Sequence, residues 1–154
     1  MRLRQQACRA RRPSPRRAAA RGPSCRIDHG GGRACEQTKL VRWEATFRDH
    51  VGRLADAGEL GPEILDVGPW WRDAPPVEID AVALAGRQRT AVRAGEAKWS
   101  RRMDGARLRR GLEHKAEVLP RPAPDLRYAV CAREEVTNAE GVLAVTARDV
   151  FSPA

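Results

Sequence analysis

The fold prediction rests on residues 77–98, whose sequence is VEIDAVALAGRQRTAVRAGEAK. Two runs in this stretch, Val77–Leu84 and Thr90–Lys98, are rich in β-branched and small apolar residues, and a turn near Ala85-Gly86 separates them. Two such runs around a short connection are typical of a β-hairpin. The stretch therefore predicts two paired antiparallel strands.

An amphipathic helix is predicted ahead of the hairpin. Apolar residues recur there at the spacing of one helix face, at Leu40, Trp43, Phe47, Val51 and Leu54. Gly58 is a natural end for this helix, because glycine readily adopts the left-handed conformation that closes many helices. Glu44 lies at the edge of the apolar face, where an inward carboxylate needs a partner. A short strand, Glu63–Val67, is expected next, bounded by two Gly-Pro pairs.

The segments after the hairpin continue an α/β pattern. Apolar residues at helical spacing predict a helix over Asp104–Leu119, which Pro120 ends. The nearly continuous apolar run Leu126–Ala132 is typical of a buried parallel strand, and Cys131 within it is expected to be a buried small hydrophobe. Val142–Thr146 is a candidate further strand, followed by a short helical end. The predicted fold class is α/β with the core order α-β-β-β-α-β.

Charge and composition separate an N-terminal tail from this domain. Residues 1–36 hold ten arginines against two acids, a net charge of +8, whereas the other 118 residues hold 19 basic and 18 acidic residues. The tail is dominated by Arg, Pro, Gly, Ser and Ala and lacks aromatic residues, so it is predicted to be disordered. A nucleic-acid-binding arm, a solvated tail and a mis-assigned translation start all remain open for it. The folded domain is then expected over residues 37–154.

Nothing in the sequence predicts export or membrane insertion. No apolar run follows the basic N-terminus as in a secretory signal, and no apolar window is long enough to span a bilayer. A cytoplasmic, reducing setting is therefore expected, in which the four cysteines would not form disulfides. The oligomeric state stays open.

Three charged residues occupy strand positions that are usually apolar. Asp80 lies inside the first run, and Glu96 and Lys98 lie at the end of the second. Side-chain alternation places Glu96 and Lys98 on one face, and pairing of the hairpin can bring Asp80 beside them. The three are the candidate catalytic residues.

This set of residue types suits metal-assisted chemistry on phosphodiesters. Carboxylates are the oxygen ligands that Mg²⁺ or Mn²⁺ takes, so Asp80 and Glu96 are candidate metal ligands. A bound metal lowers the pKa of a water and offsets charge on a reacting phosphate. Lys98 would orient the water, stabilise developing charge or, with a lowered pKa, act as a base. The sequence leaves these lysine roles open.

The same residues carry a family resemblance. Val77-Glu78-Ile79-Asp80 followed by Gly95-Glu96-Ala97-Lys98-Trp99 resembles the D…ExK signature of PD-(D/E)xK nucleases. More narrowly, three segments together resemble the C-terminal domain of archaeal-type ATPases, a domain of unknown function: WEATF at 43–47, GPWW at 68–71 and GEAKW at 95–99. The resemblance covers about residues 41–151.

The resemblance implies a restriction-endonuclease-like core and makes Glu44 a further metal-site carboxylate. The chain contains no Gly-x4-Gly-Lys-Ser/Thr loop, so no nucleotide site is expected in it. An ATPase module that works with this domain would lie on another chain. A truncated ATPase gene is the other explanation that the resemblance leaves open.

Basic residues concentrate just after the candidate site. Residues 98–115 contain seven Lys or Arg against two acids. Clustered cations of this kind can follow a DNA phosphate backbone, although a solvated helix face gives the same pattern. The candidate DNA-binding residues are Arg101, Arg102, Arg107 and Arg110.

The leading functional prediction is metal-dependent hydrolysis of DNA phosphodiester bonds. The alternative is a non-catalytic DNA- or protein-binding module of an ATPase, present here without its motor. Fold analogy does not choose between them, so enzyme activity stays open. Trp70, Trp71 and Trp99 are expected to be packed anchors rather than platforms for bases.

Overall fold

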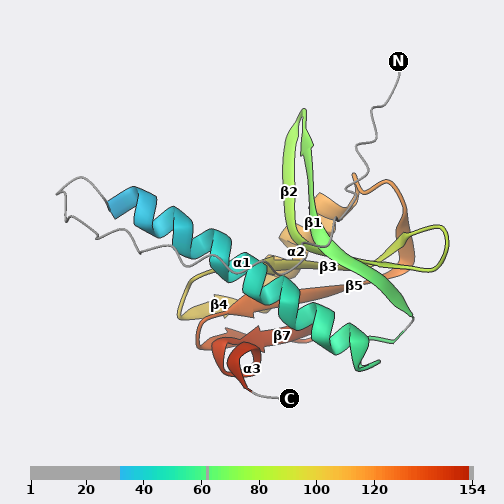
Figure 1. The fold of residues 1–154 in the computed structure, drawn as a ribbon. Coiled ribbons are helices and arrows are strands. Elements are labelled where there is room, and N and C mark those ends of the chain that lie inside the picture. The colour runs from blue at the N-terminus through green and yellow to red at the C-terminus, as the bar shows by residue number, and fades with distance from the viewer. Residues whose placement is uncertain (1–31, 62, 153–154) are drawn as a thin grey trace, which may run out of the picture.

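The computed structural model describes residues 32–61 and 63–152, with side chains from residue 41 onward. It is a mixed α/β fold with a mostly sheet core (Figure 1). The elements in chain order are α1 (Gly32–Asp56), β1 (Ile64–Asp73), β2 (Pro76–Ala85), β3 (Thr90–Ala97), β4 (Arg102–Asp104), α2 (Gly105–Ala116), β5 (Pro122–Ala132), β6 (Glu135–Thr137), β7 (Val142–Thr146) and α3 (Ala147–Phe151).

The main sheet has five strands in the order β1-β2-β3-β5-β7. β1, β2 and β3 pair antiparallel, whereas β5 pairs parallel with both β3 and β7. β4 and β6 form a separate parallel pair. The last four residues of β5 are buried, as expected for a parallel strand that is covered on both faces.

The sheet separates two hydrophobic cores. On one face α1 contributes Trp43, Phe47 and Val51, which confirms its predicted apolar stripe. On the other face α2 contributes Leu112 and Ala116. In Figure 1, α1 crosses in front of the sheet and α2 lies behind it. The central strands therefore lie between two helices.

α1 ends near Gly58 as its sequence predicts, whereas α2 ends at Ala116, before the predicted Leu119. Gly58 has φ 75°, and its N–H donates to Ala55 O at 2.9 Å, which closes α1. Asp104 precedes α2 and accepts a hydrogen bond from the Arg107 N–H at 2.8 Å. Such an N-cap satisfies one of the free N–H groups of the first turn.

Gly95 in β3 lets α1 approach the sheet closely. A Cβ at this position would lie 2.9 Å from two ring atoms of Phe47 and 3.3 Å from Ala129 O. Gly95→Ala is therefore expected to destabilise the fold by about 1–3 kcal/mol, measured by urea unfolding. Gly111→Ala is the control, because a Cβ there meets nothing within 4 Å and alanine favours a helix. Equal stability of the two variants would contradict the predicted close contact.

The structure agrees with the predicted element order and differs in several bounds. Val142–Thr146 is a strand with the predicted bounds, and the hairpin is formed by β2 and β3. β1 was predicted to stop at Val67, which is wrong: a register shift between Gly68 and Trp70 lets the strand continue past Pro69. β4 and β6 were not predicted. α1 begins at Gly32, inside the predicted tail; residues 1–31 lie outside the described part, so the disorder prediction stays untested.

The predicted buried side chains are confirmed in part. Cys131 is fully buried, and burial raises the pKa of its thiol to about 12. Trp70 is half-buried, but Trp71 is 63% exposed, so the prediction that Trp71 is a packed anchor is wrong. Trp99 is 39% exposed although it packs edge-to-face on Trp43, with ring centroids 5.0 Å apart.

The β1–β2 hairpin projects beyond the rest of the sheet, and its tip is the highest part of the described chain in Figure 1. β2 pairs with β3 only from Ala81 onward, so the first residues of β2 extend past the end of β3. Within the described ranges, no helix is long and apolar enough to cross a membrane. The projecting hairpin is the main departure from a packing in which helices cover both faces of the sheet.

Candidate active site

The candidate site lies where β2 and β3 separate. The last residues that pair are Ala81 and Gly95. Asp80, just before Ala81, and Glu96, just after Gly95, therefore lie where the two strands diverge. Both carboxylates are buried, with 6% of each residue exposed. Asp80 Oδ2 accepts a hydrogen bond from the Ala97 N–H at 2.8 Å, which ties the first strand to the second. The structure thus brings together the two acids that the sequence singled out.

Two lysines hold the Glu96 carboxylate. Lys98 Nζ lies 2.7 Å from Glu96 Oε1, and Lys115 Nζ from α2 lies 2.7 Å from Glu96 Oε2. Burial alone would raise the pKa of Glu96, but the hydrogen bonds from both lysines outweigh it and hold the pKa below its usual value. Glu96 is therefore ionised, with one cation on each oxygen.

Lys98 is charged in this arrangement. Burial favours loss of its proton, but the hydrogen bond and charge of Glu96 more than compensate, so the pKa of Lys98 is raised. A raised pKa argues against the neutral-base role and favours the role in which the ammonium stabilises negative charge. About 44% of the Lys98 side chain is exposed, so its ammonium can meet a ligand from solvent.

Asp80 also belongs to a cluster of three carboxylate side chains. Oxygens of Glu44 from α1, Glu78 from β2 and Asp80 all lie within 4.8 Å of one another. Burial, followed by the charges of Asp80 and Glu78, raises the pKa of Glu44. Burial likewise raises the pKa of Asp80, against the opposing effect of the Ala97 hydrogen bond. These three residues, called the carboxylate trio below, have no salt bridge among the described side chains.

The carboxylate trio fits a divalent cation in size and chemistry. Mg²⁺ binds oxygen at about 2.0–2.1 Å, so opposite ligands of one ion are roughly 4.2 Å apart. The oxygens here lie within 4.8 Å of each other, which an ion of this kind would draw only slightly closer. The three carboxylates repel one another, and none of them forms a salt bridge with a described side chain. A bound cation would neutralise this negative charge. The residues therefore suit an Mg²⁺ or Mn²⁺ ion.

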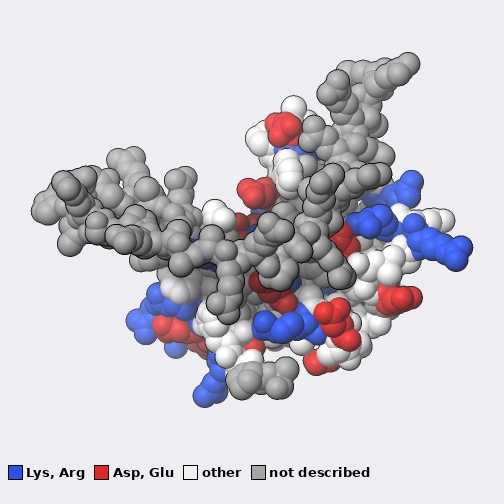
Figure 2. All heavy atoms as spheres, viewed as in Figure 1, with Lys and Arg blue, Asp and Glu red and all other residues white. Residues whose placement is uncertain are grey.

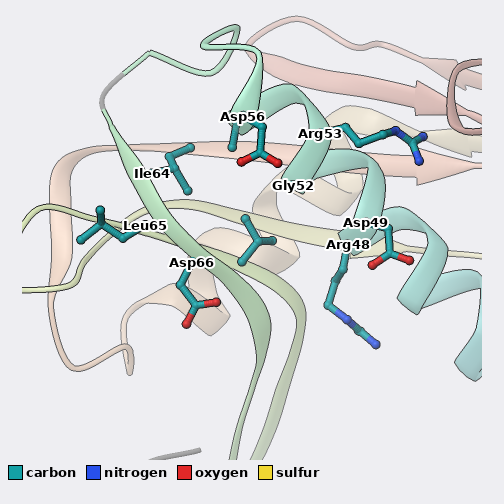
Figure 3. A pocket seen from close by; sticks show the side chains of 10 residues that line it. Arg48, Asp49, Gly52, Arg53, Asp56, Ile64, Leu65 and Asp66 are labelled. Carbon is teal, nitrogen blue, oxygen red and sulfur yellow. The ribbon is translucent and has the colours of Figure 1, made fainter. Parts of the chain in front are cut away.

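A hollow of about 410 Å³ lies between α1 and β1 (Figure 3). It is lined by Arg48 and Asp49 of α1 and by Leu65 and Asp66 of β1. Arg48 Nη1 donates to Asp80 O at 2.8 Å, so this residue connects the hollow to the back of the site. No member of the carboxylate trio lines the hollow, so it is not where the candidate chemistry would occur.

The four candidate DNA-binding arginines separate into two pairs. Arg101 donates from Nε to both oxygens of Glu134, at 3.0 and 2.9 Å, and Arg102 Nε lies 2.6 Å from Glu135. The charges of Arg101 and Arg102 are therefore largely neutralised by glutamates of the protein itself. Arg107 and Arg110 are exposed on α2 and make no salt bridge with any described residue. They are the better candidates of the four for an outside partner.

Charged side chains of both signs are spread over the visible face of the molecule (Figure 2). Figure 2 shows acidic side chains on the projecting hairpin and basic ones on the side that carries the β2–β3 turn and the start of β5. Arg87, Arg89 and Arg121 occur in those segments, at the opposite end of β3 from Lys98. The basic residues near the site are thus the lysines and the α2 arginines.

Glu78 and Lys115 belong to the site but were not predicted from the sequence. Glu78 could have been found, because it stands two residues before Asp80 and such residues share one face of a strand. Lys115 carries no such signal: its contact with Glu96 depends on how α2 lies across the sheet. The site thus has four acids and two lysines rather than the predicted three acids and one lysine.

Fold and site together define a mixed α/β domain with a partly buried carboxylate–lysine cluster at the end of its central hairpin. A family model described as "Archaea bacterial proteins of unknown function" matches residues 37–110, a little under half of the chain. The matched segment contains every residue of the site except Lys115. Searches of curated proteins and of solved structures gave no match.

Proposed function

We propose that this domain hydrolyses phosphodiester bonds of DNA with the help of a divalent cation, as a PD-(D/E)xK-like nuclease. The observation that carries the proposal is the position of Asp80. Its buried carboxylate belongs to the carboxylate trio and also contributes to the charge around Lys98. The carboxylates that suit a cation and a charged lysine therefore share one residue at one strand end, which supports metal-assisted cleavage.

In this proposal Asp80, Glu44 and Glu78 hold the cation. When bound, the cation lowers the pKa of a water and neutralises charge on the phosphate. Lys98 stabilises the negative charge that develops on the phosphate oxygens. Glu96 positions Lys98 through their 2.7 Å contact, and each of its oxygens already accepts a hydrogen bond from a lysine. Glu96 was predicted from the sequence to be a metal ligand, and we assign it instead to the positioning of Lys98.

A cleavage assay on the full chain tests the function. Plasmid and single-stranded DNA are incubated with Mg²⁺, with Mn²⁺ or with EDTA, for the wild-type protein and for Lys98→Ala. Cutting that needs the metal and falls with Lys98→Ala is the expected result. Absence of cutting by a folded chain with both metals would reject the nuclease and favour the binding-module alternative, whose ATPase partner would then be sought.

Metal binding is expected to raise the thermal stability of the wild-type chain. A cation at about 100 times its Kd stabilises the folded state by about 2.7 kcal/mol, which is roughly 5–10 °C in Tm for a chain of this size. Glu78→Gln removes one carboxylate of the trio and should reduce this rise. Glu140→Gln is the control, because Glu140 is exposed and outside the cluster. Equal metal-induced shifts in both variants would show that the trio does not bind the ion.

A further inference from the structure

The projecting hairpin carries two adjacent tryptophans, of which Trp70 packs against the hydrophobic core and Trp71 is exposed. Trp70 pairs with Ile79 across the hairpin and packs against the core on the α2 face. Its neighbour Trp71 is 63% exposed. Adjacent residues of a strand point to opposite faces, so burial of the first indole leaves the second in the open. A large exposed indole at this place is not explained by the packing of the domain.

Trp71 lies beside the carboxylate trio. In the β1–β2 register Trp71 is directly opposite Glu78. Residues opposite each other on antiparallel strands share a face, with Cβ atoms about 4.5–5.5 Å apart. Since Glu78 is a member of the trio, the exposed indole is one cross-strand neighbour from the candidate cation site.

An open hollow of about 490 Å³ lies between these residues. It is lined by Trp71, Arg72 and Asp73 of β1 and by the Pro76–Glu78 segment of β2. Arg72 Nε donates to Pro75 O at 3.3 Å, and no salt bridge of Arg72 occurs among the described side chains. The hollow therefore offers a flat apolar ring and a guanidinium available to an anion, beside the carboxylates of Asp73 and Glu78. Its volume is within the range of small-molecule sites, about 300–1,000 Å³.

We propose that this hollow holds one unpaired nucleotide of the substrate, with its base stacked on Trp71 and its phosphate on Arg72. The choice of nucleic acid as occupant rests on the proposed function. A base inside a duplex has both faces covered by its neighbours, so stacking on an indole requires a single strand or a frayed end. The substrate class is then single-stranded or frayed nucleic acid, and Trp71 places the next phosphodiester beside the carboxylate trio.

Binding measured without catalysis tests this inference separately from the nuclease. A fluorescently labelled single-stranded oligonucleotide and a blunt duplex are titrated with the full chain in EDTA, with anisotropy as the readout. Trp71→Ala is expected to weaken single-strand binding about 5- to 100-fold, which is the usual effect of losing one stacked base. Trp71→Phe should retain most of the affinity, because a phenyl ring also stacks. Leu65→Ala is the control, since Leu65 is 51% exposed on the same strand.

Arg72→Gln supplies an independent readout. Loss of one phosphate contact should lower the slope of log affinity against log salt concentration by about 0.7 for a single strand. Trp71→Ala should leave that slope unchanged. Equal loss of single-strand and duplex binding in Trp71→Ala, or no single-strand binding by the folded wild-type chain, would overturn the inference. Trp71-dependent binding without cleavage under any metal would uphold it and reject the nuclease alone.

Discussion

Asp80→Asn should reduce the metal-dependent cleavage rate by roughly 10²–10³-fold, because a bound cation supplies several kcal/mol of charge stabilisation and each 1.36 kcal/mol is tenfold in rate. The amide has nearly the shape of the carboxylate, and its oxygen can still accept the hydrogen bond from Ala97 N–H. The substitution removes the charge that the carboxylate trio and Lys98 share. The rate at saturating DNA is the measurement.

Two comparisons make the Asp80→Asn result specific. Asp66→Asn on β1 breaks an exposed pair with Arg89, so it should leave the cleavage rate within a few fold of wild type. The metal-free Asp80→Asn protein should be at least as stable as wild type, because it loses a buried charge that lies among other carboxylates. An unchanged cleavage rate in a folded Asp80→Asn protein would mean that the activity belongs to another site or to a contaminant.

The convergence of Asp80, Glu96 and Lys98 could be predicted because it depends on local rules. Strand alternation sets which side chains share a face, and a short turn makes the pairing of β2 with β3 nearly obligatory. The same local rules gave the bounds of β7, whose apolar run is short and isolated. Such features need no knowledge of how distant segments pack.

The features that the sequence did not predict depend on tertiary contacts. β4 and β6 have three residues each and exist through pairing with each other, so neither carries a pattern of its own. β1 passes Gly68-Pro69 because a register shift absorbs the missing N–H donor of proline. The exposure of Trp71 follows from the hairpin leaving the sheet, and the Lys115 contact follows from the path of α2. None of these is encoded within a short window of sequence.

Removing both lysines from Glu96 is expected to destabilise the fold by about 3–5 kcal/mol, which is the usual cost of leaving a buried charge without its partner. The Glu96 side chain is only 8% exposed, whereas Lys98 and Lys115 are 44% and 31% exposed. The expected loss of folding free energy therefore comes from leaving the buried Glu96 carboxylate unpaired, because the lysines can be solvated by water. Lys98→Met and Lys115→Met keep the aliphatic stems and remove the charges, so urea unfolding of the double variant reports the loss of pairing.

The two lysine substitutions should not be additive. Each single variant leaves one cation on Glu96 and is expected to lose no more than about 1.5 kcal/mol, so the double variant should exceed the sum of the singles. Adding Glu96→Gln to the double variant removes the orphaned charge and should recover most of the stability. Small additive losses with no recovery would mean that water, not lysine, solvates Glu96. That outcome would also remove the reason for assigning Glu96 to the positioning of Lys98, because a hydrated carboxylate would be free to bind the cation with Asp80.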